Sequence, residues 1–226
     1  MNHLHRMIEA LKFANPFCLV PRFDDGLAHC IEASVCGAEV LRRQRIVART
    51  LPCAVVVTGE LGQGWSLGLN PRQLYALTRP NLPFEEWSRV RFASKPVDDH
   101  PIHMVIEAKH AGQRAIIDLT IGQLRSLGRA PVPLHLHAMV GVDGGWVELT
   151  GDGVVITYMD SPNTEHLPAE ARDYHDPNYV DDLHRMMELA LRCQLDRVRY
   201  LDELRRLNPE GVERCNERLS RWMAGP

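Results

Sequence analysis

This sequence of 226 residues lacks the features that mark membrane-spanning, secreted or strongly charged proteins. No window approaches the roughly 18 uninterrupted apolar residues that a membrane helix needs. Residues 1–13 also lack the charged-then-apolar layout of a secretory signal. The formal net charge is only −3, so there is no concentration of basic charge for binding nucleic acid or an anionic membrane. We therefore expect a cytoplasmic protein that binds neither nucleic acid nor membranes.

Paired cysteines are missing as well. None of the cysteines belongs to a C-x-x-C pair, and their spacing shows no series of metal ligands. In a reducing compartment such cysteines are mostly buried thiols, so we expect no disulfide scaffold, no metal and no cofactor. The six are Cys18, Cys30, Cys36, Cys53, Cys193 and Cys215.

What the sequence does contain is typical of a folded globular protein. Hydrophobic residues make up 45% and charged residues 24% of the chain, while aromatic residues contribute only 6%. This composition excludes a disordered chain and a collagen-like repeat. The length is enough for one large or two small hydrophobic cores.

The hydrophobic pattern predicts helices followed by an antiparallel sheet. We expect a short helix over 2–14, ended by Asn15-Pro16, and a helix over 28–45 lined by small residues. Strands follow, with the hairpin signal at 109–112. The predicted strands are 46–58, with Pro52 at an edge or irregularity, then 102–108, 114–119, 131–138 and, within 145–158, further strand candidates.

Two further regions complete the predicted organisation. Residues 59–101 are rich in turn residues and hold one short helix, Pro71–Thr78, so we interpret them as an insert or lid. From Asp176 onward apolar residues keep a helical spacing for about 30 residues, and Pro209 then begins a final helix. We predict an α+β fold with a catalytic domain over 1–175 and a C-terminal helical hairpin over 176–226, packed on the core. These helices could also pair two copies of the chain.

Three residues stand out as a candidate catalytic triad. Cys30 lies where a loop becomes a helix, and the partial positive charge of a helix N-terminus stabilises a thiolate. His103 begins an apolar strand, where a neutral imidazole could take the thiol proton. Asp118 ends the neighbouring strand, from which its carboxylate could orient the imidazole. Cys, His and Asp in this order, on a helix and two adjacent strands, form the constellation of papain-like and transglutaminase-like enzymes.

Two sequence blocks carry the resemblance to the transglutaminase-like family. HCIEASVCGAEVLRRQRIVARTL resembles the family segment in which a cysteine opens a helix, the helix ends in Leu-Arg, and Ile-x-Ala-Arg begins a strand. HMVIEAKHAGQRAIIDLT is similar to its His-x-x-apolar-Glu strand, hairpin, and strand ending in Asp-x-Thr. The second block contributes His103, Glu107, Asp118 and Thr120. The resemblance implies a Cys30-His103-Asp118 triad on a helix and a sheet.

Other histidines offer competing interpretations. His100 lies beside Asp98-Asp99 and could bind a metal or act as the base, but Pro101 breaks any helical pairing with His103. His135 and His137 alternate along a strand and therefore share a face. A polar face of an edge strand explains them without a metal.

The triad implies a cysteine enzyme that forms a thioester with an acyl group. We expect it to hydrolyse an amide or peptide-type bond in a protein, a peptide or a small amide. The alternatives are transfer to an amine, as in transglutaminases and N-acyltransferases, or a non-catalytic interaction protein that keeps the fold. The backbone N–H of Cys30 is the candidate oxyanion donor.

Overall fold

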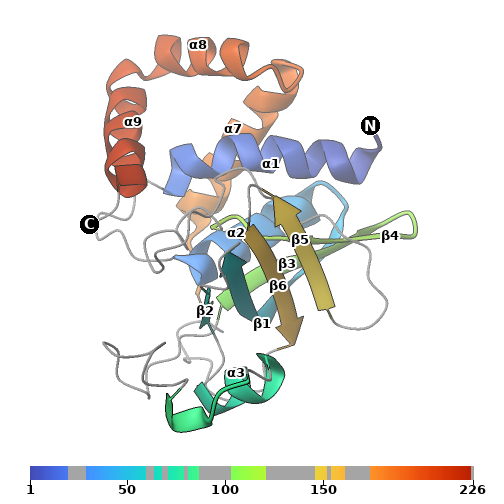
Figure 1. Ribbon diagram of the computed structural model, residues 1–226. Coiled ribbons are helices and arrows are strands. Elements are labelled where there is room, and N and C mark those ends of the chain that lie inside the picture. Colours follow the sequence, from blue (N-terminus) through green and yellow to red (C-terminus); the bar gives the residue numbers. More distant parts are fainter. Residues whose placement is uncertain are drawn as a thin grey trace.

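The computed structural model describes residues 1–19, 29–59, 64–67, 71–78, 81–86, 103–120, 146–151, 154–160 and 174–224. Over these ranges the chain is an α+β structure in which helices pack on an antiparallel sheet (Figure 1), as the sequence predicts. The helices are α1 (His3–Leu19), α2 (Cys30–Arg43), α3 (Pro71–Thr78), α7 (Pro177–Arg192), α8 (Arg197–Leu207) and α9 (Pro209–Ala224). The strands are β1 (Val47–Gly59), β2 (Gly64–Leu67), β3 (His103–His110), β4 (Gln113–Ile117), β5 (Trp146–Gly151) and β6 (Val154–Asp160).

The long strand β1 organises the sheet, whose order is β4-β3-β1-β6-β5, with β2 also paired to β1. Its first half, Val47 to Cys53, pairs with β3, and its second half, Cys53 to Gly59, pairs with β6. Pro52 therefore pairs with β3 and lies one residue before the pairing of β1 with β6 begins. A proline has no N–H for a second ladder, so this position is compatible with the prediction that Pro52 marks an edge or irregularity of the strand.

The hairpin between β3 and β4 is also confirmed. Its turn residues Ala111 and Gly112 have φ angles of 49° and 77°. Two successive residues with positive φ form the tight turn that matches the twist of antiparallel strands. His110 and Gln113 are paired directly beside this turn, and this pair fixes the register of the residues further along the two strands.

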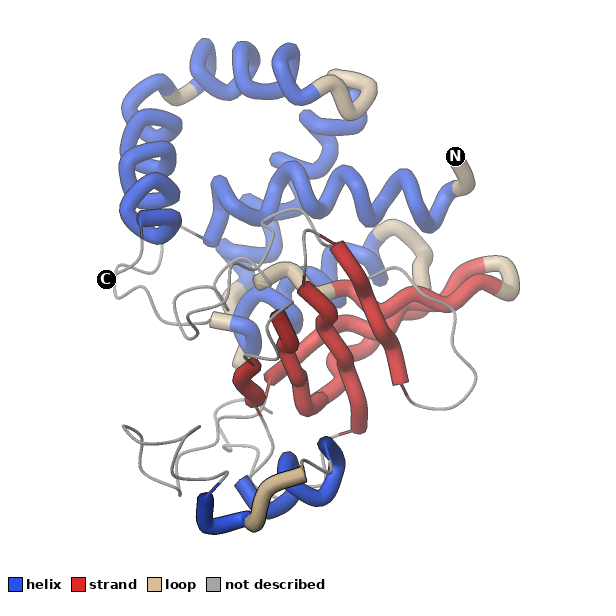
Figure 2. The backbone as a smooth tube through the Cα atoms, in the orientation of Figure 1, coloured by secondary structure: helices blue, strands red, loops and turns tan. Residues whose placement is uncertain are grey.

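The helices cover the sheet and supply most of the core. Helix α2 packs on β1 and β3, while α7 packs on α1 and α2. Figure 2 shows these helices gathered at one side of the sheet, with α3 beyond its opposite end. One large hydrophobic cluster joins α1, α2 and the C-terminal helices to β1, β3 and β4. Helix α7 is thus part of the same core that holds the strands.

Close packing of α2 on the sheet depends on Gly37. A Cβ atom at this position would lie 2.7 Å from Leu119 Cδ1 and 2.8 Å from Ile106 Cδ1. We expect Gly37→Val to reduce the free energy of unfolding by about 1–3 kcal/mol, because inserted methyl groups displace packed side chains. Chemical denaturation measures this change, and an unchanged midpoint would contradict such close packing.

The predicted end of the first helix is wrong. Helix α1 continues through Pro16 to Leu19, although a proline usually excludes the helical conformation from the residue before it. That residue, Asn15, is buried, donates from Nδ2 to the carbonyl of Leu119 at 2.9 Å, and accepts from the Tyr179 hydroxyl at 3.2 Å. Tertiary contacts therefore hold Asn15 in the helix.

The predicted continuous helix up to Leu207 is also wrong, because the chain breaks between α7 and α8. Gln194 and Leu195 have φ angles of 59° and 61°, which no α-helix contains. Asp196 then caps α8 by accepting a hydrogen bond from the Arg199 N–H at 3.0 Å. The apolar spacing continues across the break, so periodicity alone did not reveal it. The C-terminal part consists of three helices, α7, α8 and α9.

Several predictions fall outside the described residues. They concern His100, the strand over 131–138 with His135 and His137, and most of the insert over 59–101. Within that insert the helix Pro71–Thr78 is confirmed as α3, and β2 is a strand that the sequence did not predict.

Candidate active site

Cys30 is the first residue of α2, as its sequence context predicts. The N–H groups of the first turn of a helix have no acceptor within the helix, and their dipoles favour negative charge. The preceding residue, His29, makes no side-chain cap to these groups; its ring instead lies 3.3 Å from the Glu32 carboxylate. Among the described residues, the start of α2 therefore provides a positive potential at the Cys30 thiol.

His103 and Asp118 meet at the opposite end of the hairpin from its turn. Ile106 pairs with Ile117, so the same register would set Val105 opposite position 118 and make His103 its diagonal neighbour on one face. His103 Nε2 lies 2.8 Å from Asp118 Oδ2. Both residues are fully buried, whereas Cys30 is 7% exposed. Of these three residues, only Cys30 has any exposed surface.

The other ring nitrogen of His103, Nδ1, is available to Cys30. It is buried and makes no hydrogen bond of standard geometry to any described residue. Cys30 acts on the same imidazole through charge and a hydrogen bond. Nε2 contacts Asp118, so Nδ1 is the nitrogen left for Cys30. The three predicted residues therefore lie in the spatial order Cys30, His103, Asp118.

The charges in this group stabilise the protonated imidazole. Burial by itself lowers the pKa of His103, but the Asp118 carboxylate and the Cys30 thiol outweigh burial and raise the pKa to about 10. Burial likewise raises the pKa of Asp118, but the His103 charge and hydrogen bonds from His103, Thr120 and Tyr158 hold it below its ordinary value. Near neutral pH the pair is therefore a carboxylate and an imidazolium.

The Asp118 carboxylate accepts hydrogen bonds on both oxygens. Thr120 donates to Oδ1 from its backbone N–H at 2.8 Å and from its hydroxyl at 3.1 Å. The hydroxyl of Tyr158 donates to Oδ2 at 2.8 Å. Thr120 belongs to the Asp-x-Thr motif of the sequence, whereas Tyr158 was missed. A tyrosine between the apolar residues of a buried strand is the signal that could have suggested it, because a buried hydroxyl requires a partner.

Two further hydrogen bonds fix the backbone next to the triad. The Ser34 hydroxyl, one turn after Cys30 on α2, donates to the carbonyl of Met104 at 2.9 Å. Asn15 donates to the carbonyl of Leu119, as described above. Each bond connects a helix to the residue directly beside His103 or Asp118. The relative position of α2, β3 and β4 is therefore set by buried polar contacts as well as by packing.

Glu107, in the second sequence block, also has a structural role: it accepts from Arg49 Nε at 2.5 Å and from Arg114 Nε at 2.6 Å. Burial raises the pKa of Glu107, but these two guanidinium groups outweigh burial and lower it. Only 3% of Glu107 is exposed. This cluster joins β1, β3 and β4 four residues along β3 from His103 and so stabilises the strands that carry the candidate site.

In the described part of the chain, other reactive groups form no comparable arrangement. Within the described ranges, no three His, Cys, Asp or Glu side chains are placed to hold a metal ion. The other five cysteines are buried as well. Cys53 on β1 is paired with His103 on β3, so it is the cysteine directly opposite His103 in the sheet.

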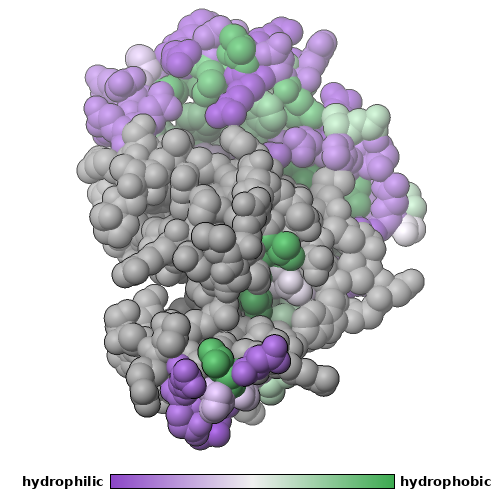
Figure 3. Space-filling view, in the orientation of Figure 1, coloured by the Kyte–Doolittle hydropathy of each residue, from purple (hydrophilic) through white to green (hydrophobic). Residues whose placement is uncertain are grey.

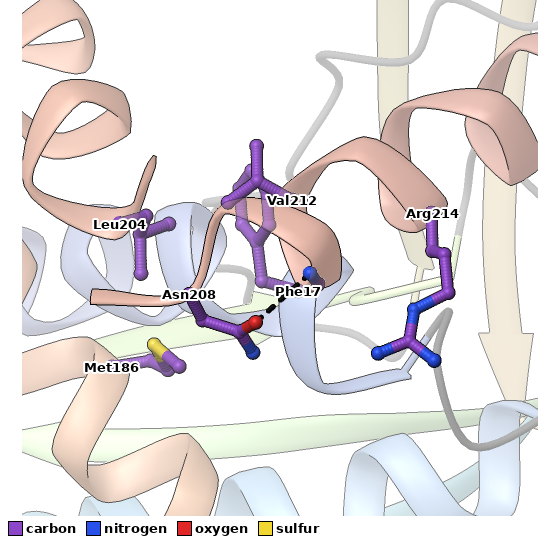
Figure 4. A pocket seen from close by; sticks show the side chains of 7 residues that line it. Phe17, Met186, Leu204, Asn208, Val212 and Arg214 are labelled. Carbon is purple, nitrogen blue, oxygen red and sulfur yellow. Dashed lines mark hydrogen bonds between the residues drawn. The ribbon is translucent and has the colours of Figure 1, made fainter. Parts of the chain in front are cut away.

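A cavity lies away from these residues, among the helices. It has a volume of about 260 Å³ and is lined from α1, α7, α8 and α9 by Phe17, Met186, Leu204, Asn208, Gly211, Val212 and Arg214 (Figure 4). Asn208 accepts a hydrogen bond from the Gly211 N–H there at 2.9 Å. Figure 3 shows mainly hydrophilic side chains on the outer surface of the nearby helices α8 and α9. Pairing of two copies through these helices stays a prediction.

Comparisons with protein-family models, curated proteins and solved structures find no match to this chain. In the described part of the chain, every helix is too short or too polar to cross a membrane.

Proposed function

We propose that this protein is a cysteine-dependent acyl-transfer enzyme that acts on an amide or peptide-type bond, with Cys30 as nucleophile, His103 as acid and base, and Asp118 as the residue that orients His103. The observation that carries the proposal is the fully buried contact between His103 Nε2 and Asp118 Oδ2, with Cys30 acting on the same imidazole. The order of the residues and their elements resembles the transglutaminase-like and papain-like enzymes, which supports the same chemistry.

In the first half-reaction the Cys30 thiolate attacks the carbonyl carbon of the substrate. A bond forms between Sγ and carbon, and the carbonyl electron pair moves to oxygen, where the Cys30 backbone N–H is our candidate donor. The oxyanion then re-forms the carbonyl as the bond to the leaving amine breaks. The imidazolium of His103 gives its proton to that amine. The products are a thioester on Cys30, a free amine and a neutral His103.

In the second half-reaction the neutral imidazole takes a proton from water, whose oxygen attacks the thioester carbon. The carbon–sulfur bond breaks, the acid leaves, and the thiolate and the imidazolium are restored. A primary amine in place of water would give a new amide by the same steps. We propose hydrolysis as the main reaction because water is always present. The substrate would be a protein, a peptide or a small amide in the cytoplasm.

Trapping an acyl group on Cys30 tests this function. We expect p-nitrophenyl acetate to acetylate one cysteine, which intact-mass and peptide mass spectrometry would locate at Cys30. Cys30→Ala should remove the adduct, while Cys36→Ala, a change to a buried cysteine of the same helix, should keep it. Hydroxylamine is then added as an amine-type acceptor that competes with water for the thioester. The ratio of hydroxamic acid to free acid compares transfer to an amine with hydrolysis. Equal labelling of several cysteines, unaffected by Cys30→Ala, would refute the proposal.

A further inference from the structure

The two oxygens of Asp118 are held by different parts of the chain. Oδ1 accepts two hydrogen bonds from Thr120, two residues further along. Oδ2 accepts one from His103 Nε2 and one from the Tyr158 hydroxyl, each at 2.8 Å. The oxygen that faces the imidazole is therefore the same one that receives the tyrosine. This shared atom couples Tyr158 directly to the geometry of the proposed triad.

Tyr158 reaches this oxygen from a distant strand. It lies on β6 opposite Val55 of β1, so β1 separates it from β3 and His103 in the sheet order. Its side chain is 2% exposed, and its ring centre lies 6.4 Å from that of His103, with the planes tilted by 37°. Because β1 and β3 lie between β6 and β4 in the sheet, the position of the Tyr158 side chain relative to Asp118 is fixed by the register of four strands.

The Tyr158 hydroxyl is a permanent donor. Burial and the charge of Asp118, with a smaller contribution from Cys53, raise the pKa of Tyr158 well above its ordinary value. Its proton therefore stays on the oxygen at every pH at which the protein would work. Among the described residues, the titratable groups that act on Asp118 are His103 on β3 and Tyr158 on β6; Cys30 on α2 acts on His103, and Cys53 on β1 acts on Tyr158.

We propose that Tyr158 is a positioning residue of the acyl-transfer site: by donating to Oδ2, it holds the Asp118 carboxylate ionised and aligned with His103 Nε2. This inference rests on the proposed function, because it assigns a role within the same reaction. A buried carboxylate beside an imidazolium can lose its charge by taking a proton, and each donor on the carboxylate opposes that transfer. Without the Tyr158 hydroxyl, the Asp118 carboxylate loses one hydrogen bond that keeps it charged and aligned with His103.

Tyr158→Phe tests the inference because it removes one hydroxyl and keeps the ring. We expect the maximal rate of Cys30 acetylation by p-nitrophenyl acetate to fall by about tenfold, with the half-saturating ester concentration unchanged, because the donor acts on the imidazole and not on the substrate. We also expect the acid limb of the pH profile for Cys30 alkylation to move to higher pH by about one unit. Loss of a hydrogen bond to a charged group raises the carboxyl pKa by about this much.

Tyr200→Phe is the matched control. Tyr200 is equally buried, its ring packs against Phe13 and Phe17, and its hydroxyl has no hydrogen-bond partner among the described residues. The control should retain the wild-type profile. If Tyr158→Phe does not fold, a ring-fluorinated tyrosine at position 158 offers a stronger donor of nearly the same shape, and the acid limb should then move to lower pH.

The outcomes separate this inference from the function on which it rests. If His103→Ala slows labelling of Cys30 but the acid limb is the same in Tyr158→Phe, Tyr200→Phe and wild type, the role of Tyr158 is refuted and the triad stands. If His103→Ala itself leaves the labelling unchanged, the proposed function fails first. A loss of stability in Tyr158→Phe without any movement of the acid limb would mean that the hydroxyl serves the fold alone.

Discussion

His103→Ala is expected to slow the alkylation of Cys30 by iodoacetamide at about pH 5.5 by at least roughly tenfold. An ordinary thiol with a pKa of about 8.5 is only about 0.1% thiolate at this pH. A neighbouring imidazolium favours a thiolate over a thiol, although part of the gain in rate is lost because a less basic thiolate is a weaker nucleophile. Tenfold is therefore the lower limit of the loss expected when the imidazolium is removed. Peptide mass spectrometry at timed intervals measures the rate.

The same variant should lose more in turnover than in alkylation. General acid–base catalysis contributes about 10²–10⁴ in rate, and alanine can neither protonate the leaving amine nor activate water. The other buried cysteines serve as internal references, since their labelling should not respond to His103. Equal rates at Cys30 and Cys193 in the wild-type protein, unaffected by His103→Ala, would exclude an activated thiol.

Much of this site follows from local sequence features. Cys30 stands near the start of a helix that the pattern of small residues and its polar ending predict over 28–45, and α2 (Cys30–Arg43) lies within that range. The hairpin signal sets the register that makes His103 and Asp118 diagonal neighbours. These are short-range effects, in which a turn type or a helix end is decided by the residues within it. For that reason the helix start at Cys30 and the hairpin register could be predicted from the sequence alone.

The parts that the sequence did not reveal depend on contacts between distant segments. Tyr158 lies 40 residues from Asp118, and nothing near either residue indicates that β6 joins the sheet next to β1. Asn15 stays helical before Pro16 because it bonds to Leu119, 104 residues away. In both cases a tertiary hydrogen bond decides the outcome, and local preferences carry no information about it.

Loss of the Asp118 charge is the second change with a large expected effect. Asp118→Asn keeps the size of the side chain but removes the carboxylate that faces a fully buried imidazolium. Breaking a buried ion pair by neutralising one partner costs about 3–5 kcal/mol. His103 can release its proton in response, so we expect a loss near the lower limit, about 3 kcal/mol near pH 6. Urea denaturation of the two proteins at that pH measures it. Activity should fall by about 10⁴, since an amide can favour the wrong imidazole tautomer.

The dependence of this stability difference on pH has a definite sign. His103 has a pKa of about 10 in the folded protein, against about 6.5 for an unperturbed histidine. The stabilisation from its protonated form is fully present below about pH 6.5 and is lost as the pH rises through about 10. Asp118 has a lowered pKa, so its contribution is fully present above about pH 4 and is lost below that, as the pH falls through its folded value. The advantage of wild type over Asp118→Asn should therefore be largest between about pH 4 and 6.5.

Comparing two variants at each pH removes the titration of residues common to both. The difference in unfolding free energy should shrink as the pH is raised from about 6 to 10. Deprotonation of His103 then removes its ion pair with Asp118, and only the wild-type protein has this pair. Asp181→Asn is the control: this carboxylate pairs with Arg43 on the surface and is 61% exposed. An exposed ion pair adds little to stability because solvent screens it, so that variant should differ little from wild type across the same range. A constant difference for Asp118→Asn from about pH 6 to 10 would mean that His103 is neutral in the folded protein, and the imidazolium required to protonate the leaving amine would be absent.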